Sequence, residues 1–475
     1  MNEANLAIIF KKGNPELPQN YRPIALLNVT YKLLAMIILK RIVPHIDDRI
    51  DKSQYGFRKK RSTAQPLFIL RRAQEMQEEA GLETHILLLD WEKAFDKVSQ
   101  KKLLTALTRI GIPPKIVSMI KAIYDNPKFS IKDGNRTTEN RQQHTGIRQG
   151  CPLSPYLFVI LLTIMMKDIT DNMTPEELRI LDRGKLNHEV TKNLFYADDT
   201  IIMTATAQAT QLILQKIQRE SKKYGMKLNQ NKCEHIRLNA IHRIQFENGE
   251  EVPTTQNAAY LGARIHHNGD QKCEIKTRIA AAWLTVMKLD LFWRKAPVTL
   301  KWKLRVLDAV IHSKVLYGME SLVISQSDFD KIDAFQNRIF RKILNIKHSY
   351  WSHVTNATVM NTANNRARNI DKNIEIVPLS TKLKQRIVKF YGHIIRSDPN
   401  TDQVRAISID EDGNRISAPK PWRSGRPKLK WYDTAKQLVI QQLEKLNIIP
   451  STWQTDFTQY ELNQQIITAA KERVF

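Results

Sequence analysis

Short apolar runs in the first half of the chain alternate between the patterns of strands and of helices. Four consecutive apolar residues, 86–89, precede Asp90, which is the pattern of a strand buried on both faces. Residues 193–204 read as two strands joined by a turn at residues 198–199, which predicts a hairpin. Residues 155–166 form a largely apolar helix that would pack under such a sheet. The order of these elements predicts an α+β domain with one face of its sheet covered by helices.

The second half of the chain has the periodicity of helices. Residues 276–295 and 299–317 carry apolar positions at helical spacing on either side of a proline break, and a third such pattern covers residues 328–344. Residues 349–373 are polar and rich in asparagine, and we interpret them as a linker. The sequence therefore predicts a basic all-helical block after the α+β domain.

Composition and charge point to a globular protein with a polyanionic partner. Of the 475 residues, 42% are hydrophobic and 26% are charged, which is ordinary globular composition. Lys and Arg number 74 against 48 Asp and Glu, and the net charge of +26 makes nucleic acid the first candidate partner. The longest apolar run, 157–166, is broken only by Thr163 and is half of the ~20 residues that a membrane span needs. With no signal peptide and no CxxC pair among three cysteines, we expect an intracellular protein that is neither secreted nor membrane-bound.

Three aspartates in apolar surroundings are the candidate catalytic groups. Asp90 ends the predicted buried strand, and Asp198 and Asp199 occupy the turn of the hairpin. Ionised carboxylates in such places are costly unless cations neutralise them. Oxygen ligands without nearby His or Cys favour Mg²⁺ over zinc, and convergent carboxylates together with substrate phosphates form two-metal sites for phosphoryl transfer. An isolated Asp-Asp pair is more often an ordinary β-turn, so the neighbouring motifs decide between these interpretations.

The motifs around these acids resemble those of reverse transcriptases, in the family's order and at similar spacings. Residues 195–199 (Phe-Tyr-Ala-Asp-Asp) match the Y-x-D-D signature, residues 90–96 resemble the first palm motif, and residues 148–155 resemble the motif between them. The sequences of these motifs are most similar to those of the LINE-type reverse transcriptases of non-LTR retrotransposons. Further similar motifs are residues 11–13, 21–24 and 54–58 in the fingers, 224–232 in the palm, and 391–393, 425–427 and 431 in the tail.

The resemblance implies an α+β right-hand polymerase followed by a basic C-terminal region. We expect fingers over residues 1–84 (N-terminally incomplete), a palm with an antiparallel sheet and the catalytic motifs over 85–268, and a helical thumb over 269–348. Residues 349–475 would hold the linker and a basic, mainly helical region that binds nucleic acid. LINE-type proteins with such a tail usually carry an upstream endonuclease, so we interpret the chain as the C-terminal polymerase portion without that domain.

The resemblance also assigns the metal ligands. Asp90 and Asp198 would bind two Mg²⁺ ions, which Mn²⁺ could replace, and Asp199 would support them. Lys232 matches a lysine proposed as general acid for the departure of pyrophosphate in such polymerases. An exposed structural lysine on a strand is an equally good interpretation of Lys232, and the sequence does not decide between the two.

The substrate site follows from the same resemblance. Phe95 would lie against the 2′ carbon of the sugar and reject ribonucleotides by steric clash. Gly150 permits close approach of the backbone to the nucleotide, and Gln149 could contact its base or sugar. Cations of the fingers would bind the triphosphate and the template backbone. The implied substrate-binding residues are Lys11, Lys12, Arg22, Phe95, Gln149 and Gly150, and the implied primer grip is Tyr260, Leu261 and Gly262.

Two basic stretches are the candidate nucleic-acid contacts. Residues 420–432 place five cations among three aromatic residues without an acid, and single strands are held by such a combination of charge and base stacking. A solvated basic loop is the alternative. The second stretch lies in the fingers, beside Phe57. The predicted nucleic-acid-binding residues are Arg58, Lys59, Lys60, Arg61, Lys420, Arg423, Arg426, Lys428, Lys430 and Trp431.

These features imply an RNA-directed DNA polymerase that extends a DNA primer on an RNA template, by target-primed reverse transcription. Its partners would be the RNA template, the DNA primer or target, deoxynucleoside triphosphates, and an endonuclease supplied upstream or in trans. We expect it in the nucleus and cytoplasm. One alternative is a truncated, inactive retroelement remnant that binds RNA or DNA. Another is an RNA-templated RNA polymerase, against which Phe95 argues.

Overall fold

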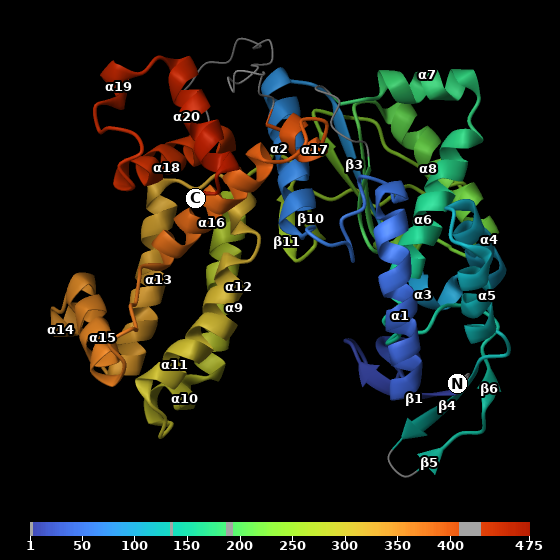
Figure 1. Ribbon diagram of the computed structural model, residues 1–475, viewed down its shortest axis with the longest axis horizontal. Helices are drawn as coiled ribbons and strands as arrows, with labels where there is room; N and C mark the ends of the chain where they lie inside the picture. Colours follow the sequence, from blue (N-terminus) through green and yellow to red (C-terminus); the bar gives the residue numbers. More distant parts are fainter. Residues whose placement is uncertain (1–2, 134–135, 187–192, 408–428) are drawn as a thin grey trace. The chain divides into compact units, whose positions relative to one another are not determined.

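A computed structural model describes residues 3–133, 136–186, 193–407 and 429–475 of the chain. The chain divides into two compact units, which are described separately below (Figure 1). Residues 1–66 with 82–258 form the first, here called the sheet unit, and residues 67–81 with 259–475 form the second, the helical unit. The presence of sheets with packed helices confirms the predicted α+β class.

The sheet unit is built around a four-stranded antiparallel sheet with the order β7-β8-β3-β9. Strand β3 (Thr84–Leu89) is buried at every position, as its apolar run predicts. Strands β7 (Asn193–Tyr196) and β8 (Asp199–Thr204) pair as the predicted hairpin. Strand β9 (Glu234–Leu238) pairs with the other side of β3. The buried strand and the hairpin are therefore confirmed.

Helices cover this sheet and form the core of the unit (Figure 1). Helix α8 (Ala207–Lys223) packs against β3 and β8, and α6 (Ser154–Asp171) packs against α4 (Gln100–Arg109) and α8. Most of α6 is buried, because apolar residues occupy nearly every one of its central positions. The predicted helix over residues 155–166 is thus confirmed. The unit also contains α3 (Ala94–Lys97), α5 (Pro114–Ile123) and α7 (Pro175–Arg183).

A second sheet in the same unit brings the N-terminal residues together. Strand β1 (Glu3–Phe10) pairs antiparallel with β2 (Tyr21–Leu26) and parallel with β4 (Lys128–Asp133). Helix α1 (Val29–Ile46) follows β2, and it begins where the side chain of Asn28 accepts a hydrogen bond from the N–H of Thr30. The short strands β5 (Arg136–Thr137) and β6 (Arg141–Gln142) pair with β4.

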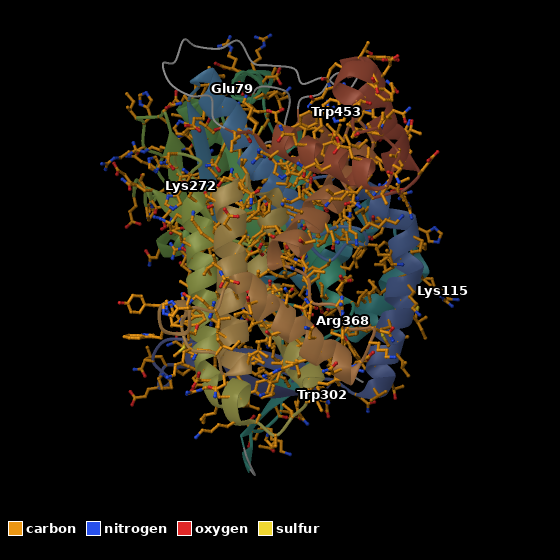
Figure 2. All side chains as sticks on the ribbon, turned by 90° about the vertical axis from the view of Figure 1, so that its left-hand side faces the viewer. Glu79, Lys115, Lys272, Trp302, Arg368 and Trp453 are labelled. Atoms are coloured by element: carbon orange, nitrogen blue, oxygen red, sulfur yellow. The ribbon has the colours of Figure 1, made fainter. Side chains whose placement is uncertain are left out.

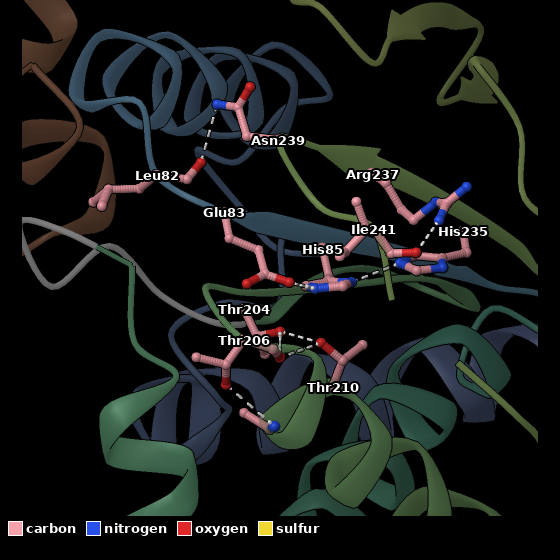
Figure 3. A network of polar contacts seen from close by, with 11 residues as sticks. Leu82, Glu83, His85, Thr204, Thr206, Thr210, His235, Arg237, Asn239 and Ile241 are labelled. Carbon is pink, nitrogen blue, oxygen red and sulfur yellow. Dashed lines mark hydrogen bonds and ion pairs between the residues drawn. The ribbon is translucent and has the colours of Figure 1, made fainter. Parts of the chain in front are cut away.

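A buried pair of histidines lies at the end of the four-stranded sheet where β3 begins (Figure 3). Nε2 of His85 lies 2.7 Å from Oε1 of Glu83, and Nδ1 of His85 lies 2.9 Å from Nε2 of His235. Because a carboxylate only accepts, the proton of a neutral His85 lies on Nε2, and His235 then donates to His85. Burial, together with the charges of His85 and Arg237, lowers the pKa of His235 to about 3. Both rings therefore stay neutral around neutral pH.

The helical unit begins with a helix from early in the chain and a small hairpin. Helix α2 (Ala64–Ala80) belongs to it over residues 67–81, although the predicted boundaries place these residues in the fingers. The hairpin consists of β10 (Asn257–Tyr260) and β11 (Ala263–His266). The other helices of the unit are α9 (Lys272–Lys288), α10 (Asp290–Lys295), α11 (Leu300–Val306), a π-helical turn (Leu307–His312), α12 (Ser313–Leu316), α13 (Gln326–Leu344), α14 (Ser349–Ser352), α15 (Asn356–Ile370), α16 (Leu379–Ile395), α17 (Asp402–Arg405), α18 (Trp431–Lys445), α19 (Trp453–Asp456) and α20 (Gln459–Lys471).

The interpretation of residues 349–373 as a linker is wrong, since this segment contains α14 and α15. Helix α15 buries Val359, Ala363 and Ala367, which recur every four residues and pack on α13. This stripe is narrow and made of small side chains, so the many asparagines around it hide it in the sequence. The division into fingers, palm, thumb and tail stays a prediction. Among the described residues, no helix is both long and apolar enough to cross a membrane.

Candidate active site

The register of the sheet brings the three candidate acids together. Leu89 pairs with Thr200 in the β3–β8 ladder, so Asp90, the next residue after β3, comes opposite Asp199 at the start of β8. Tyr196 pairs with Asp199 across the β7–β8 hairpin, which leaves Ala197 and Asp198 as its turn. Segments that are about a hundred residues apart in the sequence thus place their carboxylates at one end of the sheet.

The turn of the hairpin has a strained backbone that a distant glutamine supports. Ala197 is buried and has φ of 60°, in the left-handed region that residues other than glycine seldom adopt. Its N–H donates to Oε1 of Gln54 at 3.0 Å, and the same oxygen accepts from the N–H of Gly56 at 2.8 Å. Gln54 is 1% exposed. Its amide oxygen therefore satisfies the backbone of the residue that immediately precedes Asp198.

The segment that carries Gln54, residues 53–56, runs along β7 and is here called the brace. The N–H of Phe195 donates to the carbonyl of Ser53 at 3.0 Å, and the N–H of Tyr55 donates to the carbonyl of Phe195 at 2.8 Å. Gly56 closes the brace against the turn, since a Cβ at this position would lie 2.3 Å from the nitrogen of Ala197. The glycine of this motif thus permits two backbones to approach each other closely.

The electrostatics of the acid cluster favour a bound cation. Burial, followed by the negative charges of Asp198 and Asp90, raises the pKa of Asp199 to about 6. Burial also raises the pKa of Asp198, and the charge of Asp90 adds to this effect, whereas Arg22 and Lys11 act against it. Because burial is the largest cause of both shifts, the ionised carboxylates need positive charge close to them. A divalent ion would supply that charge.

Cations from three segments surround the acids. Nζ of Lys232 lies 3.7 Å from Oδ2 of Asp90, and both side chains are about half exposed. Burial lowers the pKa of Lys11, and the nearby positive charges of Arg22, Lys232 and Lys12 lower it further. The β1–β2 hairpin explains this grouping, since Ile9 pairs with Arg22 just before the turn that begins at Lys11. The structure therefore brings Lys11, Arg22 and Lys232 to the acid cluster, and Lys12 lies beside Lys11.

The segments that carry Phe95 and Gln149 meet beside β2. Phe95 is half-buried and stacks on Phe158 of α6, with ring centroids 4.9 Å apart. Nε2 of Gln149 donates to Oδ1 of Asp96 at 2.9 Å, and the carbonyl of Gln149 accepts from the N–H of Ala25 at 2.7 Å. Asp96, which sequence reasoning did not single out, thus fixes the orientation of the Gln149 amide.

Gly150 has a second reason to be glycine. Its φ of 111° lies outside the range of most residues, and a Cβ there would lie 2.7 Å from the carbonyl oxygen of Ala25. This close packing on β2 needs a glycine whether or not a nucleotide is bound. Packing on β2 is therefore sufficient to explain the glycine. The contact of Gly150 with the nucleotide stays a prediction.

The donor set suits a magnesium ion that is shared with a substrate. In the parts of the chain that the structure describes, no three His, Cys, Asp or Glu side chains converge tightly enough to form a metal cage by themselves. Mg²⁺ keeps several waters and usually binds through one or two carboxylates plus substrate phosphates. Asp90 and Asp198, with Asp199 beside them, offer oxygen donors only, so they fit this manner of binding.

The predicted primer grip is the turn of the β10–β11 hairpin in the helical unit. Leu261 and Gly262 both have positive φ, at 47° and 73°. A guanidinium nitrogen of Arg278 donates to the carbonyl of Gly262 at 2.9 Å, and the same guanidinium lies over the ring of Tyr317. Tyr260 is 3% exposed, which leaves Leu261 and Gly262 as the accessible part of this turn.

The prediction that Arg58 binds nucleic acid is wrong, because its guanidinium is used inside the protein. The side chain is 6% exposed and forms an ion pair with Asp47 at 3.1 Å. It also donates to the carbonyls of Asp47 and Asp51, at 2.7 and 3.0 Å. Lys59 and Lys60 are exposed, and Arg61 lies over the ring of Tyr55. Nucleic-acid binding by these three cations stays a prediction.

The prediction that Trp431 stacks on bases is also wrong. Trp431 is 1% exposed, and its ring packs edge-on against Phe68 at 4.5 Å. Its Nε1–H donates to the carbonyl of Glu320 at 2.8 Å, so the polar group of the buried indole has a partner. Lys430 forms an ion pair with Glu79. The remaining predicted contacts of this stretch, Lys420, Arg423, Arg426 and Lys428, lie outside the described residues.

Comparisons with known proteins agree with this geometry. The family model described as "Reverse transcriptase (RNA-dependent DNA polymerase)" matches residues 9–265. The RNA-directed DNA polymerase from mobile element jockey of Drosophila funebris is 24% identical over 84% of this chain and 42% of its own length. The Pol polyprotein of retrotransposable element R2DM of Drosophila melanogaster is 24% identical over 57% of this chain and 26% of its own length. The chain thus spans less than half of these curated relatives.

Solved structures of polymerases are similar at a greater distance. Apo telomerase from Candida tropicalis gives a TM-score of 0.43 at 11% identity, over 85% of this chain and 69% of that one. The RNA-dependent RNA polymerase of a human picorbirnavirus gives 0.41 at 10% identity, over 80% of this chain and 61% of that one. The family match, in contrast, covers more than half of the chain. The chain belongs to the reverse transcriptase family, in its non-LTR, LINE-type branch.

Proposed function

We propose that this chain is an RNA-directed DNA polymerase of a non-LTR retroelement, which extends a DNA primer on an RNA template. The observation that carries the proposal is the meeting of Asp90 with Asp198 and Asp199 at the end of β3 and β8. The raised pKa values of Asp198 and Asp199 and the surrounding cations suit a site for two divalent ions and a triphosphate.

In this proposal Asp90 and Asp198 hold two Mg²⁺ ions, which Mn²⁺ could replace, and Asp199 supports them. When bound, such ions neutralise charge on the phosphates and favour deprotonation of the primer 3′-hydroxyl. Lys11 and Arg22 bind the triphosphate, since both interact electrostatically with the acids that would hold the metal ions. Lys232 is close enough to Asp90 to reach the departing pyrophosphate, to which it donates a proton.

Selection of deoxynucleotides rests on Phe95 and Gln149. Phe158 supports the ring of Phe95 from behind, so a ribose 2′-hydroxyl would meet a side chain that cannot swing away. Gln149 contacts the base or sugar, and its hydrogen bond to Asp96 keeps the amide in one orientation. This arrangement favours a DNA polymerase over an RNA polymerase.

The partners follow from the net charge of +26 and from the family. We propose an RNA template, a DNA primer or target, deoxynucleoside triphosphates, and an endonuclease supplied upstream or in trans. The exposed Lys59 and Lys60 and the basic residues of the C-terminal region would contact nucleic-acid backbones. The protein would act in the nucleus and cytoplasm.

The test is primer extension by the purified chain on an RNA template annealed to a DNA primer, with Mg²⁺ and deoxynucleotides. Asp198→Ala should abolish extension and leave template–primer affinity nearly unchanged, because it removes a metal ligand and no cation. Asp48→Ala, which changes an exposed aspartate elsewhere in the sheet unit, is the matched control and should extend normally. Normal extension by Asp198→Ala would refute the proposal, as would a wild-type chain that binds the duplex without extending it.

A further inference from the structure

Two neighbouring aromatic side chains on α14 are unusually exposed. Tyr350 is 72% and Trp351 is 73% exposed, whereas no other aromatic side chain of the described residues is more than 57% exposed. Aromatic rings of this size bury ~150–250 Å² when they are covered, and leaving both in water forgoes that stabilisation. Contiguous exposed apolar side chains are a feature of binding surfaces.

The pair is held in a fixed arrangement. The two rings meet edge to face, with centroids 4.9 Å apart and an interplanar angle of 87°. Nδ1 of His348 accepts a hydrogen bond from the N–H of Tyr350 at the start of α14, and His353 ends the helix with φ of 53°. The aromatic side chains thus project from a closed helical turn with a cap at each end.

Buried Arg341 fastens this turn to α13. The residue is 6% exposed, and its guanidinium donates to the carbonyls of Lys347 and Val354, at 3.3 and 2.6 Å. It also contacts the side chains of Ser352 and Asn356. One arginine therefore bonds to both sides of α14, so the rings are presented from a rigid support, which lowers the entropy cost of binding.

The stretch of sequence that carries the pair is cationic. Residues 334–370 contain six Arg and Lys and no acidic residue. Of these cations, Lys347 is exposed next to α14, and Arg366 and Arg368 are exposed on α15 (Arg368 is labelled in Figure 2). Asp371, the next acid along the chain, is already paired with Lys301 at 2.8 Å. A polyanion would meet little repulsion here.

We propose that Tyr350 and Trp351 form a stacking platform for unpaired bases of a single-stranded nucleic acid. The rings would stack on bases, and Lys347 with the arginines of α15 would contact the phosphates. A duplex keeps its bases stacked inside and so would gain only the contacts with phosphates. The platform takes the role that the sequence suggested for Trp431, which is buried. It does not depend on the proposed polymerase reaction, because binding requires none of the three acids.

The test measures the affinity of the full chain for a labelled single-stranded RNA of about 15 nucleotides, a DNA strand of the same sequence, and a blunt duplex. The double variant Tyr350→Ala/Trp351→Ala should lose about 5- to 150-fold in affinity for the single strands per ring removed, and bind the duplex within about twofold of wild type. Tyr350→Phe/Trp351→Phe keeps an aromatic ring at both positions and should keep most of the single-strand affinity. Tyr460→Ala, at an exposed tyrosine of α20, is the matched control.

Three results would overturn the proposal. Unchanged affinity of the double alanine variant for single strands would show that the rings bind something else, such as an acidic protein. An equal loss for the duplex would show that charge or folding, and not stacking, had been changed. A loss in the double phenylalanine variant as large as that in the double alanine variant would assign the effect to the polar tips of the side chains. The Asp198→Ala variant should keep the single-strand affinity, so failure of the polymerase proposal would be recognised separately.

Discussion

Replacing Gln54 with leucine tests how the turn that carries Asp198 is held. The two side chains are similar in size, but leucine lacks the oxygen that accepts from the N–H groups of Gly56 and Ala197. Gln54 is 1% exposed, so water does not replace the lost acceptor. A buried N–H without a partner costs about 1–3 kcal/mol, which gives about 2–6 kcal/mol of unfolding free energy if the turn stays in place.

If the turn changes its conformation, the loss of stability is smaller, but Asp198 moves and activity falls. The left-handed conformation of Ala197 is itself unfavourable by about 1–2 kcal/mol, so the turn has a reason to change once Gln54 is gone. The measured loss of stability should therefore lie near ~2 kcal/mol. Any change at Ala197 moves Asp198, and a displacement of ~1 Å in a catalytic group costs up to a hundredfold in rate. We expect kcat to fall about 10- to 100-fold and KM for deoxynucleotide to stay within about twofold.

The assay is steady-state primer extension together with urea unfolding. Gln65→Leu is the matched control, because Gln65 is also buried and its Oε1 accepts from a backbone N–H, that of Ser62, away from the acids. It should lower stability by about 1–3 kcal/mol and leave kcat unchanged. If Gln54→Leu keeps wild-type kcat, or if Gln65→Leu loses kcat to the same extent, the brace does not position the turn.

Other predictions concern His235, Arg58 and Phe95. Because the pKa of His235 is about 3 in the folded chain, only the unfolded chain gains its proton below about pH 6.5, and unfolding free energy should fall by ~2 kcal/mol between pH 8 and pH 5. Urea titrations should show this slope reduced in His235→Gln and kept in His45→Gln, which changes an exposed histidine. Arg58→Met should lower unfolding free energy by about 2–4 kcal/mol without weakening nucleic-acid affinity, whereas a loss of affinity with full stability would restore the sequence prediction. Phe95→Ala should raise ribonucleotide incorporation, relative to deoxynucleotide, by at least about tenfold, and an unchanged ratio in competition assays would contradict the steric gate.

The elements that carry the acids could be predicted from the sequence because each has a local signal. The buried strand before Asp90 shows an unbroken apolar run, and the hairpin around Asp198 shows two apolar runs with a polar turn. The resemblance to reverse transcriptases added the link between them. Gln54 had no local signal for its role, since that role depends on the register between the brace and β7. The support of Gln149 by Asp96 likewise depends on two segments that only the fold brings together.

The predictions that Arg58 and Trp431 bind nucleic acid were wrong because each residue type suits two different environments. An arginine in a basic stretch and a tryptophan near cations suit nucleic acid, but both also suit a buried position with polar partners. Arg58 found Asp47 and backbone carbonyls, and Trp431 found Phe68 and the carbonyl of Glu320. Burial of a side chain follows from tertiary packing, which composition does not determine.

We propose that carboxylates from distant segments share one divalent-ion site. Electron paramagnetic resonance titration of Mn²⁺ in the presence of template–primer and deoxynucleotide measures this directly. We expect Asp90→Ala and Asp198→Ala each to abolish the same class of tightly bound Mn²⁺ that the wild-type chain shows. Undiminished tight Mn²⁺ binding in either variant would contradict it.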